Sequence, residues 1–229
     1  KIKLLLENIP HEQIDNFSNS EITPQIIYGA KIVLDDNEIM MSKNIINQYN
    51  KIKNDLLFLR IFPSDKIQFS KYLNTLLDYR HTKLNKHKLN EYNLSFENNF
   101  DLFISEFCSN PSITGHVYLD ICLSKNDGVF YAGGLFFLVN NNLHYYLRCH
   151  NPDLKSKVSF GLVFDYWFQE KAKNDGIKII DYGRGDESYK FRLGAEKYQL
   201  FNVVLSPNSS KMFPNPPLLH NRKFLVDVP

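Results

Sequence analysis

Charged side chains crowd together near residue 185, directly after an aliphatic run. The run IKII leads into DYGRGDESYKFRLGA at 181–195, which gathers Asp181, Glu187 and Lys190 around two glycines. A carboxylate at the end of a buried strand is a common position for a side chain whose pKa is tuned to move protons. The segment is therefore either a solvated turn or the edge of a site.

Three consecutive strands are expected upstream of this segment. Apolar and alternating runs at 116–124, 129–139 and 143–149 are separated by the turn signals NDG and NNN, which favour antiparallel hairpins. The pair Gly133–Gly134 inside the middle strand predicts a bulge or a close approach of two backbones.

A helix and two further strands complete the pattern. We expect a helix over about 159–176, with Ser159 as its N-cap and Gly176 at its end. The buried strand 177–183 can then pair in parallel with the third strand of the meander, and 197–205 forms another strand. The order β-β-β-α-β-α-β predicts an α/β (α+β) fold with a mixed, mostly antiparallel sheet flanked by helices.

The N-terminal part of the chain is expected to be an elaboration of this core. Residues 1–62 carry short apolar runs with one helix at about 42–54, so we interpret them as a β-containing elaboration or partial lobe. Residues 63–229 would then form the main domain. A possible last strand lies at KFLVDV near the C-terminus.

Two further helices are expected near the start of the main domain. Residues 95–109 carry one aromatic stripe, which is typical of a core helix. Residues 65–92 begin with helical apolar spacing and then become basic, through Lys71, Arg80, Lys83, Lys86 and Lys88. This basic run is either a solvated helix face followed by a loop or a patch that faces phosphate or a polyanionic acceptor.

Composition excludes several classes of protein. With 43% apolar residues, 23% charged residues and a net charge of +2, the chain is an ordinary globular one without a global attraction to nucleic acid or membrane. No apolar run reaches the ~18–20 residues that span a bilayer. The cysteines are odd in number and lack C-x-x-C spacing, which favours buried free thiols in a reducing, cytoplasmic compartment: Cys108, Cys122 and Cys149.

Histidines do not predict a metal site in this chain. His116, His144 and His150 alternate with apolar residues or stand at a strand end, and no carboxylate or cysteine spacing supports them as ligands. We therefore expect a site without metal.

The segment at 181–195 resembles the C-terminal signature of a subfamily of GNAT-type acyltransferases. That subfamily includes the cellulose-biosynthesis-associated (CelD-like) acetyltransferases, with the Fem-type peptidoglycan bridge enzymes as relatives. The resemblance covers about 95–205 and implies a GNAT-like domain that acts as an acyltransferase. Its pattern of acids, glycines and a Tyr-Lys pair is matched by Asp181, Gly183, Gly185, Glu187, Tyr189, Lys190 and Gly194.

The resemblance also implies where a donor would bind. In the GNAT fold two core strands splay apart, here 143–149 and 177–183, and the pantetheine arm of acyl-CoA lies between them. Its pyrophosphate binds at the N-terminus of the intervening helix, where backbone N–H groups and the helix dipole hold anions. The donor would be acetyl-CoA or another acyl-CoA, bound by Lys155, Lys157, Ser159, Phe160, Gly161 and Arg148.

Acyl transfer to an amine needs a base and a means to stabilise an oxyanion. The resemblance implies Asp181 or Glu187 as the base and Tyr189 as the proton donor to the leaving thiolate. Lys190 would stabilise developing negative charge or bind a phosphate. The acceptor would be an amine on a small molecule, a sugar or another cell-envelope precursor.

Structural and functional alternatives stay open. Asp181 can cap the turn at 183–185, Tyr189 can be a packing residue and Lys190 a plain surface lysine. A Fem-like aminoacyl transferase that uses charged tRNA is favoured by the basic run at 71–88. A catalytically inactive GNAT-fold binding module is favoured by the single glycine of the segment at 155–161.

Overall fold

The chain forms two compact units. The larger unit comprises Ile32–Asp181 and Arg192–Gly194, and the smaller unit comprises the remaining segments of the chain. The structure is a computed structural model that describes residues 2–10, 21–34, 41–86, 102, 104–108, 110, 116–185, 187–205 and 224–227.

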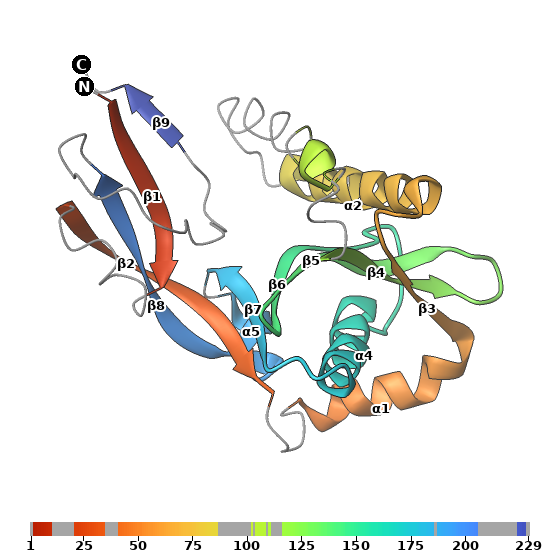
Figure 1. Ribbon diagram of the computed structural model, residues 1–229. Coiled ribbons are helices and arrows are strands. Elements are labelled where there is room, and N and C mark those ends of the chain that lie inside the picture. Colours follow the sequence, from red (N-terminus) through yellow and green to blue (C-terminus); the bar gives the residue numbers. More distant parts are fainter. Residues whose placement is uncertain are drawn as a thin grey trace. The chain divides into compact units, whose positions relative to one another are not determined.

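A sheet in the order β3-β4-β5-β6-β7 is the centre of the larger unit (Figure 1). Its strands are β3 (Leu56–Ile61), β4 (Val117–Ser124), β5 (Phe130–Val139), β6 (Asn142–His150) and β7 (Ile179–Arg184), whose first three residues belong to this unit. The first four strands pair antiparallel, and β7 pairs in parallel with β6. The predicted meander and the predicted parallel strand are both confirmed.

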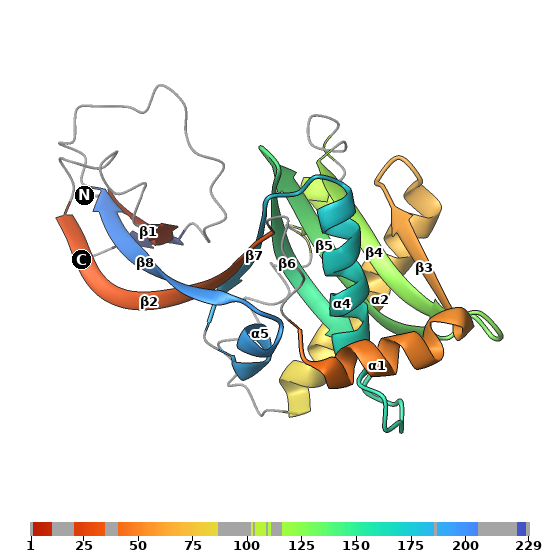
Figure 2. The same ribbon diagram turned by 90° about the horizontal axis from the view of Figure 1, so that it is seen from below.

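Helices cover both faces of this sheet. Figures 1 and 2 show α2 (Lys66–Lys86) on one face and α4 (Phe160–Asn174) on the other, with α1 (Lys43–Ile52) beside α4. A short 3₁₀ turn, η2 (Lys53–Asp55), joins α1 to β3. The predicted helices at 42–54 and 159–176 are thus present, and so is the helical start of 65–92, of which residues 87–92 lie outside the described residues. Of the helix expected at 95–109, the described residues 102 and 104–108 are helical, and the remainder lies outside the described residues.

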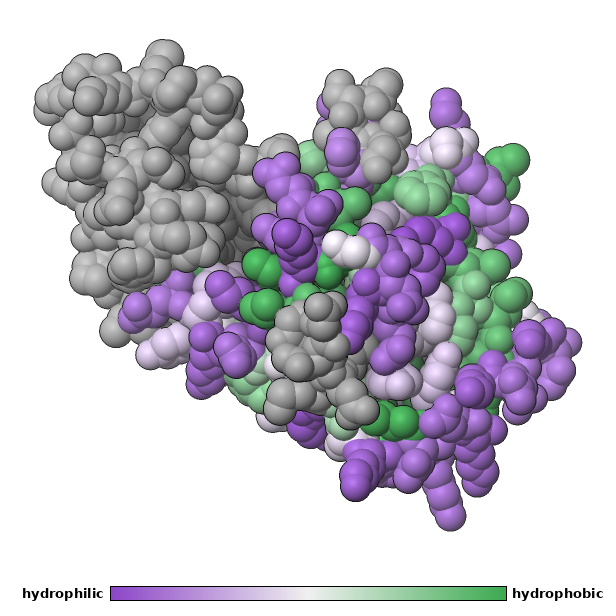
Figure 3. Space-filling view, turned by 60° about the horizontal axis from the view of Figure 1, so that its bottom comes forward, coloured by the Kyte–Doolittle hydropathy of each residue, from purple (hydrophilic) through white to green (hydrophobic). Residues whose placement is uncertain are grey.

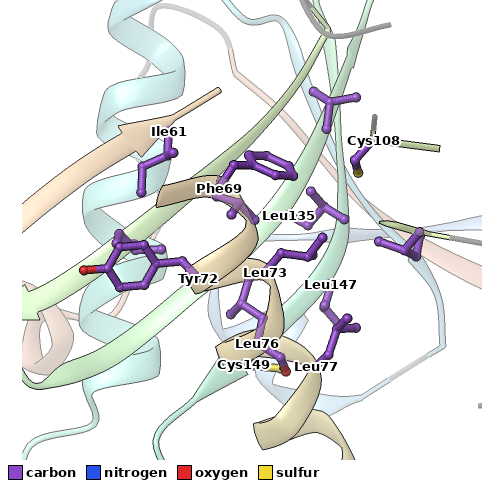
Figure 4. Packing of buried hydrophobic residues seen from close by; sticks show 14 of the residues in the cluster. Ile61, Phe69, Tyr72, Leu73, Leu76, Leu77, Cys108, Leu135, Leu147 and Cys149 are labelled. Atoms are coloured by element: carbon purple, nitrogen blue, oxygen red, sulfur yellow. The ribbon is translucent and has the colours of Figure 1, made fainter. Parts of the chain in front are cut away.

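Each face has its own apolar core. Under α2, Leu73 and Leu76 meet Leu135, Leu147 and Cys149 from the sheet, as Figure 4 shows. On the other face, α4 points aromatic side chains toward the sheet. Its Phe168 ring stacks on Phe136 of β5 with ring centroids 4.4 Å apart. Burial of each such side chain contributes roughly 1.5–3 kcal/mol, so these two cores hold the helices on the sheet.

Two glycines in β5 let the backbone of β4 and an aromatic ring of β6 approach the strand closely. A Cβ at Gly133 would lie 2.9 Å from the carbonyl oxygen of Asp120, and one at Gly134 would overlap the ring of Tyr145. The close backbone approach predicted for this pair is confirmed.

A partly buried ion-pair network ties β3, β4 and the end of α4 together. The Arg60 guanidinium binds both carboxylate oxygens of fully buried Asp120 at 2.8 Å and reaches Asp175 at 2.6 Å. It also lies over the Tyr118 ring, 4.0 Å from the centroid. Burial alone would lower the pKa of Arg60, but the hydrogen bonds and charge of Asp120 raise it above its ordinary value. The guanidinium therefore stays charged, whereas burial raises the pKa of the Asp120 carboxyl.

The smaller unit is built on four antiparallel strands and a short helix. Strand β8 (Glu196–Leu205) pairs with both β2 (Glu21–Val33) and β1 (Ile2–Pro10), and β1 pairs with β9 (Phe224–Asp227). The helix is α5 (Ser188–Arg192). The strands expected at 197–205 and near the C-terminus are thus present, and the predicted fold class, a mixed and mostly antiparallel sheet flanked by helices, is confirmed.

Residues 1–62 are divided between the two units. Strand β1 and most of β2 pair with β8, whereas β3 pairs with β4. The compact units thus divide the chain at other points than the predicted boundary after residue 62. An elaborating role for residues 1–62 stays a prediction.

The three cysteines are buried free thiols, as expected. Burial raises the pKa of Cys108 and of Cys122 to about 12, and the Cys149 thiol donates to the Leu76 carbonyl at 3.1 Å. Within the described residues, every helix is too short or too polar to cross a bilayer. Among the coloured residues of the face drawn in Figure 3, hydrophilic side chains predominate and apolar side chains form smaller patches.

Candidate functional site

Helix α4 begins without a side-chain cap. Ser159 occupies the N-cap position, but its hydroxyl makes no capping hydrogen bond, and the first turn contains no acidic residue. The Ser159 backbone N–H is held instead by the Gln48 side chain at 3.1 Å. The first backbone N–H groups of an α-helix have no intrahelical acceptor, and the dipole places about half a positive charge there. This end of α4 is thus suited to an anion.

An arginine from β6 is fixed beside this helix end. Arg148 donates from Nε to Asp165 at 3.0 Å and from NH2 to the same carboxylate at 2.5 Å. Asp165 is fully buried on α4, and the Tyr145 hydroxyl lies 3.2 Å from its other oxygen. The two β6 side chains therefore converge on one buried carboxylate.

Gly161 makes room for the guanidinium. A Cβ at this position would lie 2.9 Å from NH2 of Arg148, a distance that real Cβ atoms do not show. The guanidinium thus lies directly against the first turn of α4. The guanidinium and the positive N-terminal end of α4 repel each other at this short distance, and the negative charge of the Asp165 carboxylate offsets that repulsion.

The remaining predicted donor-binding residues surround the same helix end. Lys155 and Lys157 are exposed in the loop that leads into α4. The Phe160 ring stacks on Tyr131 of β5 with centroids 4.1 Å apart, which anchors the first residue of the helix. The structure therefore groups all six residues at β6 and the start of α4. Their binding of a donor stays a prediction.

Asp181 lies at the last pair of the β6–β7 ladder. That ladder consists of three residue pairs and ends where His144 meets Asp181. The imidazole Nδ1 lies 3.4 Å from Oδ2 of Asp181, and each side chain is 20% exposed. Asp181 is thus beside a titratable partner from the neighbouring strand.

The other predicted catalytic residues lie in the smaller unit. Lys190 is 2% exposed, and its ammonium donates to the carbonyl oxygens of Arg184 at 2.8 Å and Gly185 at 3.3 Å. It also pairs with Glu187 at 2.9 Å, whose side chain is 57% exposed. The interpretation of Lys190 as a plain surface lysine is therefore wrong. Tyr189 is half-buried on α5, and Asp186 lies outside the described residues.

Positive backbone angles explain the glycines of this turn. Gly183 and Gly185 have φ values of 68° and 110°, a region that other residues rarely adopt. The Gly185 N–H donates to the Tyr28 carbonyl at 2.9 Å, which holds the turn against β2. The glycines thus turn the chain so that its carbonyls converge on Lys190.

Three side chains of these clusters were missed by sequence reasoning. Asp165 could have been noticed as a carboxylate within the apolar stripe of α4, because a buried charge needs a partner. Tyr145 gave no such signal, and His144 was considered only as a metal ligand, since both are ordinary members of an alternating strand in the sequence. Among the described residues, no group of three or more His, Cys, Asp or Glu side chains could hold a metal ion.

Comparison with known proteins agrees with this architecture. Residues 80–191 match the family model described as an acetyltransferase (GNAT) domain. No curated protein matches the chain in sequence.

Several solved structures of differently named proteins have a similar fold. One is the C-terminal domain of a protein assigned as a lysylphosphatidylglycerol synthetase from Agrobacterium fabrum, with a TM-score of 0.61, 11% identity and coverage of 87% of this chain and 67% of that one. L-PGS from Bacillus licheniformis has a TM-score of 0.59 and 12% identity, with coverage of 87% of this chain and 66% of that one. FemX has a TM-score of 0.55 and 10% identity, with coverage of 86% of this chain and 70% of that one.

These similarities show the fold. The identities are 10–12%, and the chain spans about two thirds of the length of each of these structures. Together with the family match, they show that the protein contains a GNAT-fold, acyltransferase-like domain. Its CelD-like character, donor and acceptor are matters for proposal.

Proposed function

We propose that the protein is an N-acyltransferase that moves an acyl group, best an acetyl group, from acyl-CoA to a primary amine on a sugar or another cell-envelope precursor. One observation carries the proposal. The uncapped start of α4, with Arg148 lying against Gly161, falls inside the segment that matches the acetyltransferase (GNAT) domain.

The charges at this helix end suit the anionic part of acyl-CoA. A pyrophosphate would accept hydrogen bonds from the first backbone N–H groups of α4, where Gly161 permits a close approach. Exposed Lys155 and Lys157 would add charge from the preceding loop. Arg148 would present its remaining N–H groups while Asp165 keeps the guanidinium in place.

The acyl group would lie along β6, where the ladder to β7 ends. Asp181 stands at that point and is one of the two proposed carboxylate bases. Glu187 is the other. Tyr189 would protonate the leaving thiolate. Lys190 supports developing charge in this proposal, and to do so it would exchange its contact with Glu187 for the anion.

Binding of CoA tests the donor directly. Thermal unfolding of the whole chain would be followed with and without CoA, because a ligand at 100 times its Kd adds about 2.7 kcal/mol to the folded state. We expect Lys155→Glu/Lys157→Glu to abolish the shift and the exposed Lys178→Glu to retain it. No shift at millimolar CoA would remove acyl-CoA as the donor.

Aminoacyl transfer from charged tRNA is the second candidate. Basic side chains along α2, including Lys71 and Arg80, favour it, because contacts with phosphate groups supply most of the affinity for nucleic acid. This candidate predicts tRNA retention that weakens steeply as salt rises. The absence of retention at low salt would exclude it, and CoA binding without acyl transfer to any amine would indicate an inactive binding module.

A further inference from the structure

The end of the β6–β7 ladder holds a second titratable group beside Asp181. In the parallel register His144 stands opposite Asp181, and Nδ1 and Oδ2 are 3.4 Å apart. This distance suits an ion pair and is slightly longer than a hydrogen bond. Catalytic hydrogen bonds are commonly long before substrate binds, so a small rotation of either side chain would complete the bond.

The surroundings of His144 differ from those of an ordinary core histidine. Its neighbours along β6, Leu143 and Tyr145, are 0% and 6% exposed, and its ladder partner Phe137 on β5 is 7% exposed. His144 itself keeps 20% of its side chain in contact with solvent, and Asp181 keeps the same share. Tyr145 turns toward Asp165 on α4, so alternation places His144 on the opposite face of the sheet, away from the donor phosphates.

We infer that His144 is the general base of the proposed acyl transfer and that Asp181 is the residue that positions it. The inference rests on the proposed function and replaces direct proton removal by Asp181. A carboxylate at Nδ1 holds the ring proton there, which leaves the Nε2 lone pair as the acceptor. The same carboxylate stabilises the imidazolium that forms.

The proton balance of the step is complete with this pair. The amine nitrogen attacks the thioester carbonyl, a C–N bond forms, and the amine proton passes to Nε2 of His144. The C–S bond then breaks with its electron pair on sulfur, Tyr189 gives its proton to the thiolate, and the imidazolium returns a proton to the Tyr189 oxygen through water. The products are an amide and free CoA, and His144 ends neutral. No metal or redox partner enters the step.

Activity measurements test the role of His144. With acetyl-CoA and glucosamine as probes, we expect His144→Gln to lower kcat about 100-fold or more, in the range of general-base catalysis, and to leave KM for acetyl-CoA within about threefold. Added imidazole should restore part of the activity of His144→Gly. His150→Gln, at the exposed end of the same strand, is the matched control. A His144→Gln variant with near wild-type kcat would overturn the assignment, as would a wild type that transfers no acetyl group.

Nitrogen NMR tests the pair without any substrate. We expect His144 to carry its proton on Nδ1 in the wild type and to shift toward the Nε2–H form in Asp181→Asn. A wild-type ring protonated on Nε2 would overturn the pair whatever the activity. Failure of CoA to bind, with the Nδ1–H form present, would instead remove the proposed function and its base while leaving the His144–Asp181 contact established.

Discussion

Arg148 in the larger unit and Lys190 in the smaller unit are both largely buried cations, yet different partners hold them. Arg148 is bound by Asp165, a carboxylate that is fully buried. Lys190 is bound mainly by backbone carbonyls of a glycine-rich turn, and its carboxylate partner Glu187 is 57% exposed. A charge–charge pair shielded from water is much stronger than one at the surface.

Because their partners differ, Arg148 and Lys190 differ in how firmly each side chain is held. Arg148 is fixed for as long as Asp165 is present, so it offers a constant geometry beside the start of α4. Lys190 is held by several weaker contacts, and its ion pair is the part that solvent or a ligand can replace. The first arrangement favours binding of a permanent anion, and the second favours charge that appears during a reaction.

The largest effect is expected for Asp165→Ala. This change leaves the Arg148 guanidinium, 18% exposed, without its carboxylate, and loss of one partner from a buried ion pair typically costs about 3–5 kcal/mol. The free energy of unfolding in urea measures it. The double variant Arg148→Met/Asp165→Leu removes both charges and should recover much of the loss. A cost below about 1 kcal/mol for Asp165→Ala would contradict the contrast between the two cations.

Lys190→Met should cost less, about 1–3 kcal/mol. It removes the hydrogen bonds to the carbonyls of Arg184 and Gly185 and leaves those groups to find water, but the turn lies near enough to the surface to do so. Thermal unfolding and amide exchange at 183–187 would report it. Lys178→Met, on an exposed side chain, is the matched control. Equal stability of the two variants would show that the carbonyl contacts contribute nothing.

Alkaline pH should act through the larger unit, which holds all three cysteines. The pKa of Cys108 and of Cys122 is about 12 in the folded chain against an ordinary value of 9.0, so between these values the folded state binds more protons than the unfolded state. Stability therefore falls as pH rises from 9 toward 12, by roughly 1 kcal/mol per thiol between pH 9 and pH 10.

Urea unfolding at several pH values measures this slope, and iodoacetamide should leave both thiols unlabelled at pH 7. Cys108→Ala/Cys122→Ala should flatten the slope. An unchanged slope in that variant would place the alkaline sensitivity elsewhere.

Glu187→Gln should have the smallest effect, below about 0.5 kcal/mol. The ion pair with Lys190 is exposed on the carboxylate side, and such pairs contribute little because water and salt screen them. Thermal unfolding at low and high salt would test it. A loss comparable to that of Lys190→Met would mean that the pair, and not the carbonyls, holds the lysine.

Much of the fold could be predicted from the sequence because its signals are local. NDG with its flanking alternation predicted the hairpin from β4 to β5, and Ser159 and Gly176 bracketed α4. The division of residues 1–62 could not be predicted, since it depends on which distant strand offers an edge. Strand β8 takes β1 and β2, and β4 takes β3.

The sequence by itself determined the elements of this protein, the free buried cysteines and the charged turn at 181–195, because propensity, periodicity and glycine requirements act over a few residues. Only the tertiary structure decided the partners of the charges. Asp165 meets Arg148 because α4 crosses β6, and His144 meets Asp181 because two strands pair in a three-residue register. Side chains far apart in sequence are joined by burial and strand pairing, and no local pattern records the partner that each will find.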